Sequence, residues 1–498
     1  MACELKLAAV FGDHMVLCRD KEARVFGWAE DGARITASLG RQRSETTARG
    51  GRFELLLPPQ PAGGPYTLTV SDGESTRYFA DVWLGDVFLA GGQSNMELEL
   101  QNADGGAEAV QTANNPMIRF YNVPKQAAWS PAAELAEEQT AWRCLEPNAC
   151  PDVSAVAYHF AVELQPELNV AVGIIDCYWG GTSAATWMDA EALGTFAVGQ
   201  MYLREYEQAA GQYTPEEYER ELTAYDKRNT EWWSSAERIK KERAGVTLTE
   251  LLAELGPSPW PPPMGPRTFY RAAGLADTMV KRVAPYTLTS FLYYQGENDT
   301  GHAESYRRLM CELVLYWRAL WHDDRLPMLF CQLPMFADAG NENNTDWAEL
   351  RQAQQEAADT LRGLEMAVLI DCGELNNIHP TDKKTVGHRL YLQAMQHLYH
   401  AITTGDAPRA LRKSADGGVL MISLSAPVRC VQGGPVLVEV AGDDGCFHTA
   451  TVKLDGDTLL AASPEVPLPT QARYAWRNFA SVNLYGLNDL PLAPFWLK

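Results

Sequence analysis

Between residues 84 and 371 the chain repeats one pattern: a short apolar run, rich in β-branched and aromatic residues, precedes a stretch of helical character. The runs cover residues 87–90, 118–121, 172–178, 290–294, 328–332 and 367–371. Strands that are apolar along their whole length belong to parallel sheets covered by helices on both faces. We therefore predict an α/β catalytic-type domain, built on a parallel sheet, over residues 84–404.

The two ends of the chain have a different pattern. Residues 1–83 and 405–498 alternate short strand-like pieces with turns rich in Gly, Pro and Asp, which predicts a β-rich region on each side. Because both regions flank one central domain, we consider that the C-terminal one packs with the N-terminal one. Within the central domain, residues 195–265 are charged and helix-prone and end in a proline-rich stretch. They predict a helical insertion, which either has a function or is a solvated cap.

Composition excludes several classes of protein. A formal charge of −22 argues against a nucleic-acid partner or an anionic membrane surface. No stretch is long and apolar enough to cross a bilayer, and residues 1–6 lack the apolar core of a secretory signal. The ten cysteines are scattered without C-x-x-C spacing. We expect free thiols and a cytoplasmic location, and the oligomeric state is open.

A serine follows the first apolar run of the central domain. Residues 87–90 lead into Gly91-Gly92 and then into Gln93 and Ser94. This order places a hydroxyl at the exit of a sheet strand, where ligands collect in open α/β folds. Two glycines permit a tight turn and leave room for a substrate. An unassisted serine hydroxyl is a poor nucleophile, so Ser94 needs a nearby base.

Polar clusters containing glycine or histidine follow three other runs, at residues 180–183, 295–299 and 379–380. The carboxyl ends of parallel strands lie on one edge of a sheet, so all four clusters are expected to converge there. Each cluster alone would be a helix cap, a tight turn or a polar loop. The functional hypothesis therefore rests on the set.

The chemistry can be assigned by what a nucleophilic serine requires. His379 is the candidate base, because an imidazole titrates near neutrality. A tetrahedral intermediate needs donors aimed at its oxyanion. The backbone N–H groups of Ser94 and Gly181 and the side-chain amide of Gln295 are the candidates.

Sequence blocks at all four predicted strand ends resemble those of the sialate O-acetylesterases, which are SGNH-type hydrolases. The blocks are Gly92-Gln93-Ser94-Asn95-Met96, Trp179-Gly180-Gly181-Thr182-Ser183, Gln295-Gly296-Glu297 and Ile378-His379-Pro380. The resemblance covers most of the chain and implies a flavodoxin-like SGNH hydrolase domain flanked by β-rich regions. It also implies a carbohydrate esterase that removes O-acetyl groups from sialic acid, typically the 9-O-acetyl group, without a metal or organic cofactor. By this resemblance Ser94 would form an acetyl-serine intermediate and His379 would be the general base.

The group that orients His379 is left open. Many SGNH-type enzymes carry an aspartate three residues before the histidine, where this chain has Asn376. The alternatives are a Ser–His dyad helped by a backbone carbonyl, Glu297 from another strand end, and Glu374; we favour the dyad or Glu297. The asparagine expected in the third block of the wider group is replaced here by Gln295-Gly296-Glu297.

The sequence also leaves open which residues bind the substrate and which substrate is used. A sialate carboxylate favours a bidentate arginine, and Arg119, Arg267 and Arg271 are candidates that could equally be partners in surface ion pairs. The same chemistry could act on other acetylated sugars such as xylan. A carbohydrate-binding protein with a degenerate esterase site is the alternative from another class, supported by the β regions and fourteen tryptophans.

Overall fold

A parallel sheet forms the centre of the molecule, as predicted. In the computed structural model, which describes residues 4–243, 246, 248–431 and 436–498, five parallel strands have the spatial order β11-β8-β12-β13-β14. Numbered along the chain, this is the 2-1-3-4-5 order of a flavodoxin-like sheet. Strand β9 adds a parallel neighbour to β11, and β10 pairs antiparallel with β9. The strands are β8 Thr76–Gly92, β9 Asn115–Asn122, β10 Arg143–Leu145, β11 Ala171–Tyr178, β12 Ser290–Tyr294, β13 Met328–Cys331 and β14 Leu364–Ala367.

Strand β8 is shared by two parts of the molecule. Its first half pairs antiparallel with β7, and its second half pairs parallel with β11 and β12. The domain boundary expected after residue 83 therefore lies inside a continuous strand. Strand order reverses on either side of β8, so its carboxyl end is the switch point at which such sheets bind ligands.

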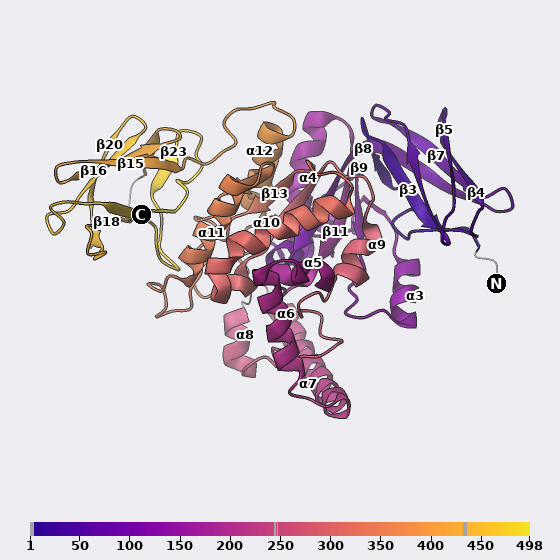
Figure 1. The fold of residues 1–498 in the computed structure, drawn as a ribbon, viewed down its shortest axis with the longest axis horizontal. Helices are drawn as coiled ribbons and strands as arrows, with labels where there is room; N and C mark the ends of the chain where they lie inside the picture. Colours follow the sequence, from indigo (N-terminus) through magenta and orange to yellow (C-terminus); the bar gives the residue numbers. More distant parts are fainter. Residues whose placement is uncertain (1–3, 244–245, 247, 432–435) are drawn as a thin grey trace.

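Helices cover both faces of this sheet (Figure 1). Phe88 of β8 packs against Phe160 of α4 with ring centroids 4.9 Å apart, whereas Gly91 lies against Trp317 of α10. Because side chains alternate along a strand, α4 and α10 lie on opposite faces. Helix α12 packs with α4, and α11 packs with α10. The α-helices outside the insertion are α1 Ser94–Glu97, α2 Gly106–Thr112, α3 Pro131–Gln139, α4 Ala155–Leu168, α5 Ala190–Gly194, α9 Lys281–Val283, α10 Ala303–Leu320, α11 Asp346–Thr360 and α12 Lys383–His397.

The N-terminal β region is built from short antiparallel strands. Strand β3 pairs with β1 and β6, while β4, β5 and β7 continue the sheet that contains β8. Burial alternates along β3 and β6, so one face of each packs into the core and the other faces solvent. The strands are β1 Lys6–Leu7, β2 Val16–Cys18, β3 Ala23–Trp28, β4 Arg34–Leu39, β5 Gln42–Thr47, β6 Arg52–Leu57 and β7 Gly63–Ser71.

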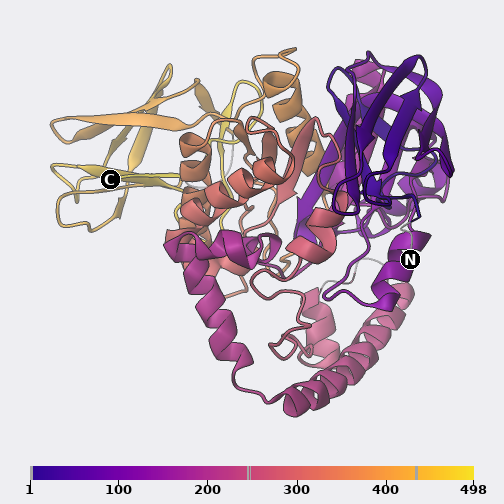
Figure 2. The ribbon, with the colours of Figure 1, turned by 45° about the vertical axis from the view of Figure 1, so that its right-hand side comes forward.

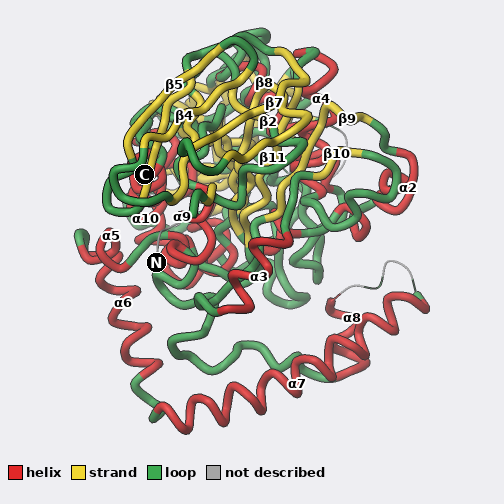
Figure 3. The backbone as a smooth tube through the Cα atoms, turned by 90° about the vertical axis from the view of Figure 1, so that its right-hand side faces the viewer, coloured by secondary structure: helices red, strands yellow, loops and turns green. Residues whose placement is uncertain are grey.

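The predicted helical insertion forms an arch that projects from the central domain (Figures 2 and 3). Its helices are α6 Ala197–Ala210, α7 Pro215–Glu242 and α8 Leu248–Leu255. Helix α7 starts at a capping box, in which Thr214 and Glu217 satisfy each other's backbone N–H groups. A small apolar cluster, which includes Trp232 and Leu251, joins α7 to α8. The arch therefore has a small core of its own.

The C-terminal β region lies at the opposite end of the molecule from the N-terminal one, so the expected packing between them is wrong (Figure 1). Its apolar core instead contacts Met335, Val368 and Ile370 of the central domain. Those side chains follow the ends of β13 and β14. They form an apolar surface of the central domain, which the C-terminal strands cover. The strands are β15 Ala410–Asp416, β16 Val419–Leu424, β17 Val428–Cys430, β18 Val438–Ala441, β19 His448–Thr449, β20 Thr451–Asp455, β21 Thr458–Ala462, β22 Gln471–Tyr474, β23 Leu484–Gly486 and β24 Phe495–Leu497.

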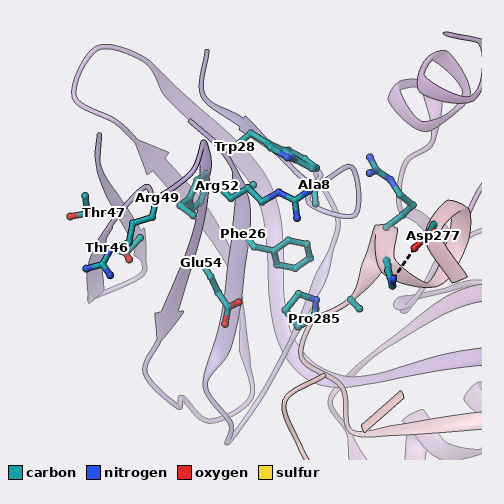
Figure 4. Close-up of a pocket in the computed structure, with 15 residues that line it drawn as sticks. Ala8, Phe26, Trp28, Thr46, Thr47, Arg49, Arg52, Glu54, Asp277 and Pro285 are labelled. Carbon is teal, nitrogen blue, oxygen red and sulfur yellow. Dashed lines mark ion pairs between the residues drawn. The ribbon is translucent and has the colours of Figure 1, made fainter. Parts of the chain in front are cut away.

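One cavity of the described structure lies away from the four strand-end clusters. A cavity of about 660 Å³ lies between the N-terminal strands and residues 277–285, where Phe26, Trp28 and Arg52 line it (Figure 4). Its lining includes none of the four strand-end clusters.

The nine cysteines in the described ranges are free thiols, as expected, and Cys3 lies outside those ranges. Among the described helices, none is long and apolar enough to span a membrane.

Candidate active site

Ser94 is the first residue of helix α1, directly beyond the carboxyl end of β8. Its Oγ lies 2.8 Å from Nε2 of His379. Gly92 makes the turn possible, because its φ is +129° and a Cβ there would collide with the carbonyl oxygen of Tyr294 on β12. The structure thus brings together the two residues that the sequence predicts as nucleophile and base.

Hydrogen bonds around the imidazole hold its loop in place. The N–H of His379 donates to Oδ1 of Asn377 at 3.1 Å, and Nδ2 of Asn377 donates to Glu374 at 2.8 Å. The side-chain amide of Asn95 donates to the carbonyl oxygen of Ile378 at 3.0 Å. Since Asn95 follows Ser94 in the chain, this last bond ties the serine turn directly to the histidine loop.

Among the described residues, no carboxylate forms a hydrogen bond with the imidazole of His379. Glu297 is not hydrogen-bonded to the imidazole, because its Oε1 accepts from Asn95 at 2.6 Å and its buried Oε2 has no hydrogen-bond partner among the described residues. Glu374 accepts hydrogen bonds within its own loop, and Asn376 accepts a backbone N–H of a neighbouring loop at 2.6 Å. Of the alternatives left open by the sequence, the geometry corresponds to the dyad of Ser94 and His379.

The surroundings of His379 favour its neutral form. Burial, followed by the positive charges of Lys383 and Lys240, lowers the pKa of His379 to about 4. A buried imidazole loses the hydration of its charged form, and nearby cations oppose a further positive charge. At neutral pH the ring is therefore uncharged, which is the form that can accept a proton from Ser94.

A buried lysine beside the site was not found by sequence reasoning. Lys383, in the first turn of α12, is 1% exposed and donates to Oδ1 of Asn95 at 2.6 Å. Asn95 in turn donates to Glu297, so one amide bridges a buried cation and a buried carboxyl. Burial lowers the pKa of Lys383 to about 8 and raises the pKa of Glu297. One sequence feature could have pointed to Lys383: it is a lysine in the first turn of a helix, where the helix dipole disfavours a cation.

Two predicted oxyanion donors are free beside the serine. The N–H groups of Ser94 and Gly181 donate to no other group among the residues that the structure describes. Gly180 approaches the serine so closely that a Cβ on it would lie 3.1 Å from Cβ of Ser94. Its N–H donates to Glu97, which is on the same short helix as the serine. The Gly180–Gly181 turn is therefore fixed in position against Ser94.

The predicted role of Gln295 as an oxyanion donor is wrong. Its side chain is 1% exposed, and its amide nitrogen donates to Gln93, Thr182 and Asp299 at 2.6–3.2 Å. This amide holds the turn together and has no capacity left for a ligand. Asn298 of the same block is exposed, and its side chain makes no hydrogen bond to any described residue. Its N–H donates to Oε1 of Gln93, the residue before the serine, at 3.2 Å, so Asn298 lies beside the serine turn with a side-chain amide that is available to a ligand.

The three arginines considered for a carboxylate are engaged in the protein's own contacts. Arg119 is 2% exposed and pairs with Asp81 at 3.0 Å and with backbone carbonyl oxygens. Arg267 pairs with Glu219 of α7. The guanidinium of Arg271 donates to carbonyl oxygens of its own loop. All three guanidinium groups therefore have partners within the protein.

The site combines a serine, a neutral base and free backbone donors at one sheet edge. These are the parts that acyl transfer through a covalent intermediate requires. The buried bridge through Asn95 fixes the serine turn against the histidine loop and the first turn of α12.

Comparison with known proteins gives consistent results. Residues 84–214 match the family described as "Carbohydrate esterase, sialic acid-specific acetylesterase". The chain is 25% identical over 525 residues to the sialate O-acetylesterase of Mus musculus, covering 95% of this chain and 89% of that protein. It is 22% identical over 541 residues to the human (Homo sapiens) sialate O-acetylesterase, covering 98% and 92%. The crystal structure of a carbohydrate acetylesterase from Xanthomonas citri is 30% identical and superposes with a TM-score of 0.77, covering 99% of each chain.

Proposed function

We propose that this chain, which belongs to the sialate O-acetylesterase family of carbohydrate esterases, removes O-acetyl groups from sialic acid, with the 9-O-acetyl group as the preferred one. The observation that carries the proposal is the 2.8 Å hydrogen bond between Ser94 and His379 at the switch point of the sheet. A serine there can act only with a base in contact and oxyanion donors beside it, and both are present.

The reaction runs in two halves. His379 takes the proton of Ser94 through Nε2 as Oγ attacks the acetyl carbonyl carbon, and the oxyanion is bound by the N–H groups of Ser94 and Gly181 and by the amide of Asn298. Collapse of this intermediate breaks the ester bond, and His379 gives its proton to the departing sugar oxygen. Water, deprotonated by His379, then attacks the acetyl-serine, and acetate leaves with Ser94 restored.

The proposed substrate is tested by measuring acetate release from an acetylated sialic acid and from acetylated xylan under the same conditions. We expect the protein to release acetate from 9-O-acetylated N-acetylneuraminic acid at least about tenfold faster, as kcat/KM, than from acetylated xylan. The reverse order would assign the site to plant-type sugars. A reactive organophosphate separates both from a binding-only protein, because an active serine is labelled at Ser94 and a degenerate site is not.

The low pKa of His379 predicts an unusual acid limit of activity. The imidazole works as a base only when neutral, and its pKa is lowered from 6.5 to about 4. We therefore expect kcat/KM for acetyl ester hydrolysis to stay level from pH 7 down to about pH 5 and to fall by half near pH 4. Circular dichroism at each pH identifies any unfolding, and a half-maximum at pH 6–7 in folded protein would contradict the buried, unpaired imidazole.

A further inference from the structure

An aromatic side chain of the insertion packs on the oxyanion turn. Trp260 lies in the loop that follows α8 and is 47% exposed. A Cβ on Gly181 would lie only 2.5–3.2 Å from three atoms of the benzene edge of this ring. Because Gly181 has no Cβ, its backbone can take a φ of +73° directly against the indole. Trp260 is therefore in contact with the residue whose N–H is expected to bind the oxyanion.

The N–H of Gly181 has no hydrogen bond to hold its direction. Hydrogen bonds fix the residues on either side: the N–H of Gly180 donates to Glu97, and the hydroxyl of Thr182 donates to a carbonyl oxygen at the start of the turn at 2.7 Å. Among the described residues, none accepts from the N–H of Gly181 itself. The direction of this N–H therefore depends on how the turn is packed, and the ring of Trp260 is the side chain that lies next to the Cα of Gly181.

A second aromatic contact joins the insertion to the same turn. Phe269 stacks on Trp179, the residue before the two glycines, with ring centroids 4.4 Å apart and planes inclined by 4°. The centroid of Trp260 lies 6.1 Å from that of Phe269 and 5.1 Å from that of Tyr270. The hydroxyl of Tyr270 donates to the carbonyl oxygen of Pro262 at 2.9 Å, which holds this part of the loop together. Trp260 and Phe269 thus belong to one aromatic group that covers the turn.

Helix α7 of the arch anchors this loop at two places. Nε1 of Trp232 donates to the carbonyl oxygen of Gly256 at 3.1 Å. Tyr218 packs on Gly265, where a Cβ would lie 2.2–2.6 Å from its ring, and its hydroxyl accepts the N–H of Arg267 at 3.2 Å. The loop is therefore attached to the long helix of the arch on both sides of its tryptophan.

We propose that Trp260 is a positioning residue, through which the helical insertion holds the N–H of Gly181 in the direction that the oxyanion requires. The inference rests on the proposed function, in which this N–H binds the oxyanion, and it adds the residue that keeps the donor in place. Oxyanion donors act because their direction is set before the reaction, and removing one costs about 10²–10³ in kcat. A displacement of about 1 Å, caused by a change outside the reacting groups, can cost about 10²-fold. Loss of the indole is therefore expected to lower kcat even for an ester that carries no sugar.

A tryptophan that contacts only the sugar of a substrate would act differently. Its removal would raise KM for sugar esters and leave 4-nitrophenyl acetate unchanged, because that ester carries no sugar. A positioning residue acts on the oxyanion, which forms from every acetyl ester. The choice of ester, and whether kcat or KM changes, therefore separates the two roles.

Steady-state hydrolysis of 4-nitrophenyl acetate and of 9-O-acetylated N-acetylneuraminic acid by the full chain tests the proposal. We expect Trp260→Ala to lower kcat about 10- to 100-fold for both esters, with KM changed less than about threefold. Phe269→Leu, which removes the stack on Trp179, should lower kcat in the same way and to a smaller degree. The double variant should lose less than the product of the two factors, because both side chains act on one turn.

Trp233→Ala is the matched control, because Trp233 is a tryptophan of the same insertion with a similar exposure of 41%, and its ring packs on Trp232 of its own helix. It should leave kcat and KM unchanged for both esters. Thermal unfolding shows whether each variant is folded, and if Trp260→Ala is not, Trp260→Phe takes its place: its shorter ring withdraws from Gly181, so kcat should fall about threefold or more. An unchanged kcat in folded protein, or a change confined to KM for the sialic acid ester, would overturn the positioning role and leave the proposed function in place. If wild-type protein shows no ester hydrolysis that depends on Ser94, the proposed function and this role are both wrong.

Discussion

Replacing Ser94 with alanine is expected to lower kcat for acetyl ester hydrolysis by about 10⁴-fold or more, to the level of the remaining oxyanion donors. The hydroxyl is the group that forms the acyl-enzyme, and its 2.8 Å contact with His379 is the means of its activation. His379→Ala is expected to lower kcat by a similar factor, because a serine without its base is a weak nucleophile. The double variant should lose little more than either single one, since the two residues act as a unit.

Mass spectrometry gives an independent readout of the same step. Wild-type protein, quenched during turnover, should carry an acetyl group on Ser94, and Ser94→Ala should carry none. Unchanged thermal unfolding would show that the losses arise from chemistry and not from folding. Substantial activity in the folded Ser94→Ala variant would contradict the nucleophile assignment and with it the whole mechanism.

The variant Lys383→Met is expected to destabilise the protein by about 3 kcal/mol, a large effect for one residue. The ammonium is fully buried and donates to Asn95, which holds Glu297 on its other side. Without the cation, the carbonyl oxygen of Asn95 is left unpaired and the buried Glu297 loses the positive charge that compensates it. A shift of the thermal midpoint by roughly 3–5 °C should be measurable by calorimetry.

The same variant should also change the pH profile of catalysis. Because the charge of Lys383 helps to lower the pKa of His379, its removal is expected to move the acid limit of kcat/KM to higher pH. Lys384→Met is the control, since Lys384 is exposed in the same helix and should affect neither stability nor the profile. Equal effects of the two substitutions would contradict a specific role for the buried bridge.

Strand-end positions were predictable from the sequence because apolar runs and glycines mark them. The convergence of Ser94, His379 and Gly181 followed from placing each cluster at the carboxyl end of a parallel strand. One strand was misplaced: residues 367–371 were predicted, and β14 is Leu364–Ala367. Val368 and Ile370 have the composition of a strand, but they pack into the core of the C-terminal region. An apolar run does not reveal which core it enters.

Side-chain assignments within the clusters were less predictable. Gln295 and Glu297 belong to a polar block, and sequence alone cannot show that both are used to hold neighbouring turns. Asn298 was part of the predicted cluster at residues 295–299, but the sequence alone does not show that its side chain is the one left without a hydrogen bond in the protein. Trp260 is distant in sequence from Ser94, and the folded insertion brings its ring against Gly181 at the sheet edge. Long-range placement of this kind has no local signal.

The shared strand β8 has a consequence for the order in which the protein folds during synthesis. Its first half can pair with β7 as soon as residue 92 is made, whereas its second half needs β11 at Ala171–Tyr178 and β12 at Ser290–Tyr294. The nascent chain thus carries an apolar half-strand that ends at the nucleophile and lacks its neighbour β12 until more than half of the protein has been made. Such unpaired edges favour aggregation and the attention of chaperones. The serine is positioned early by its own strand, and it becomes reactive only when the segment with His379 is added near the end of translation.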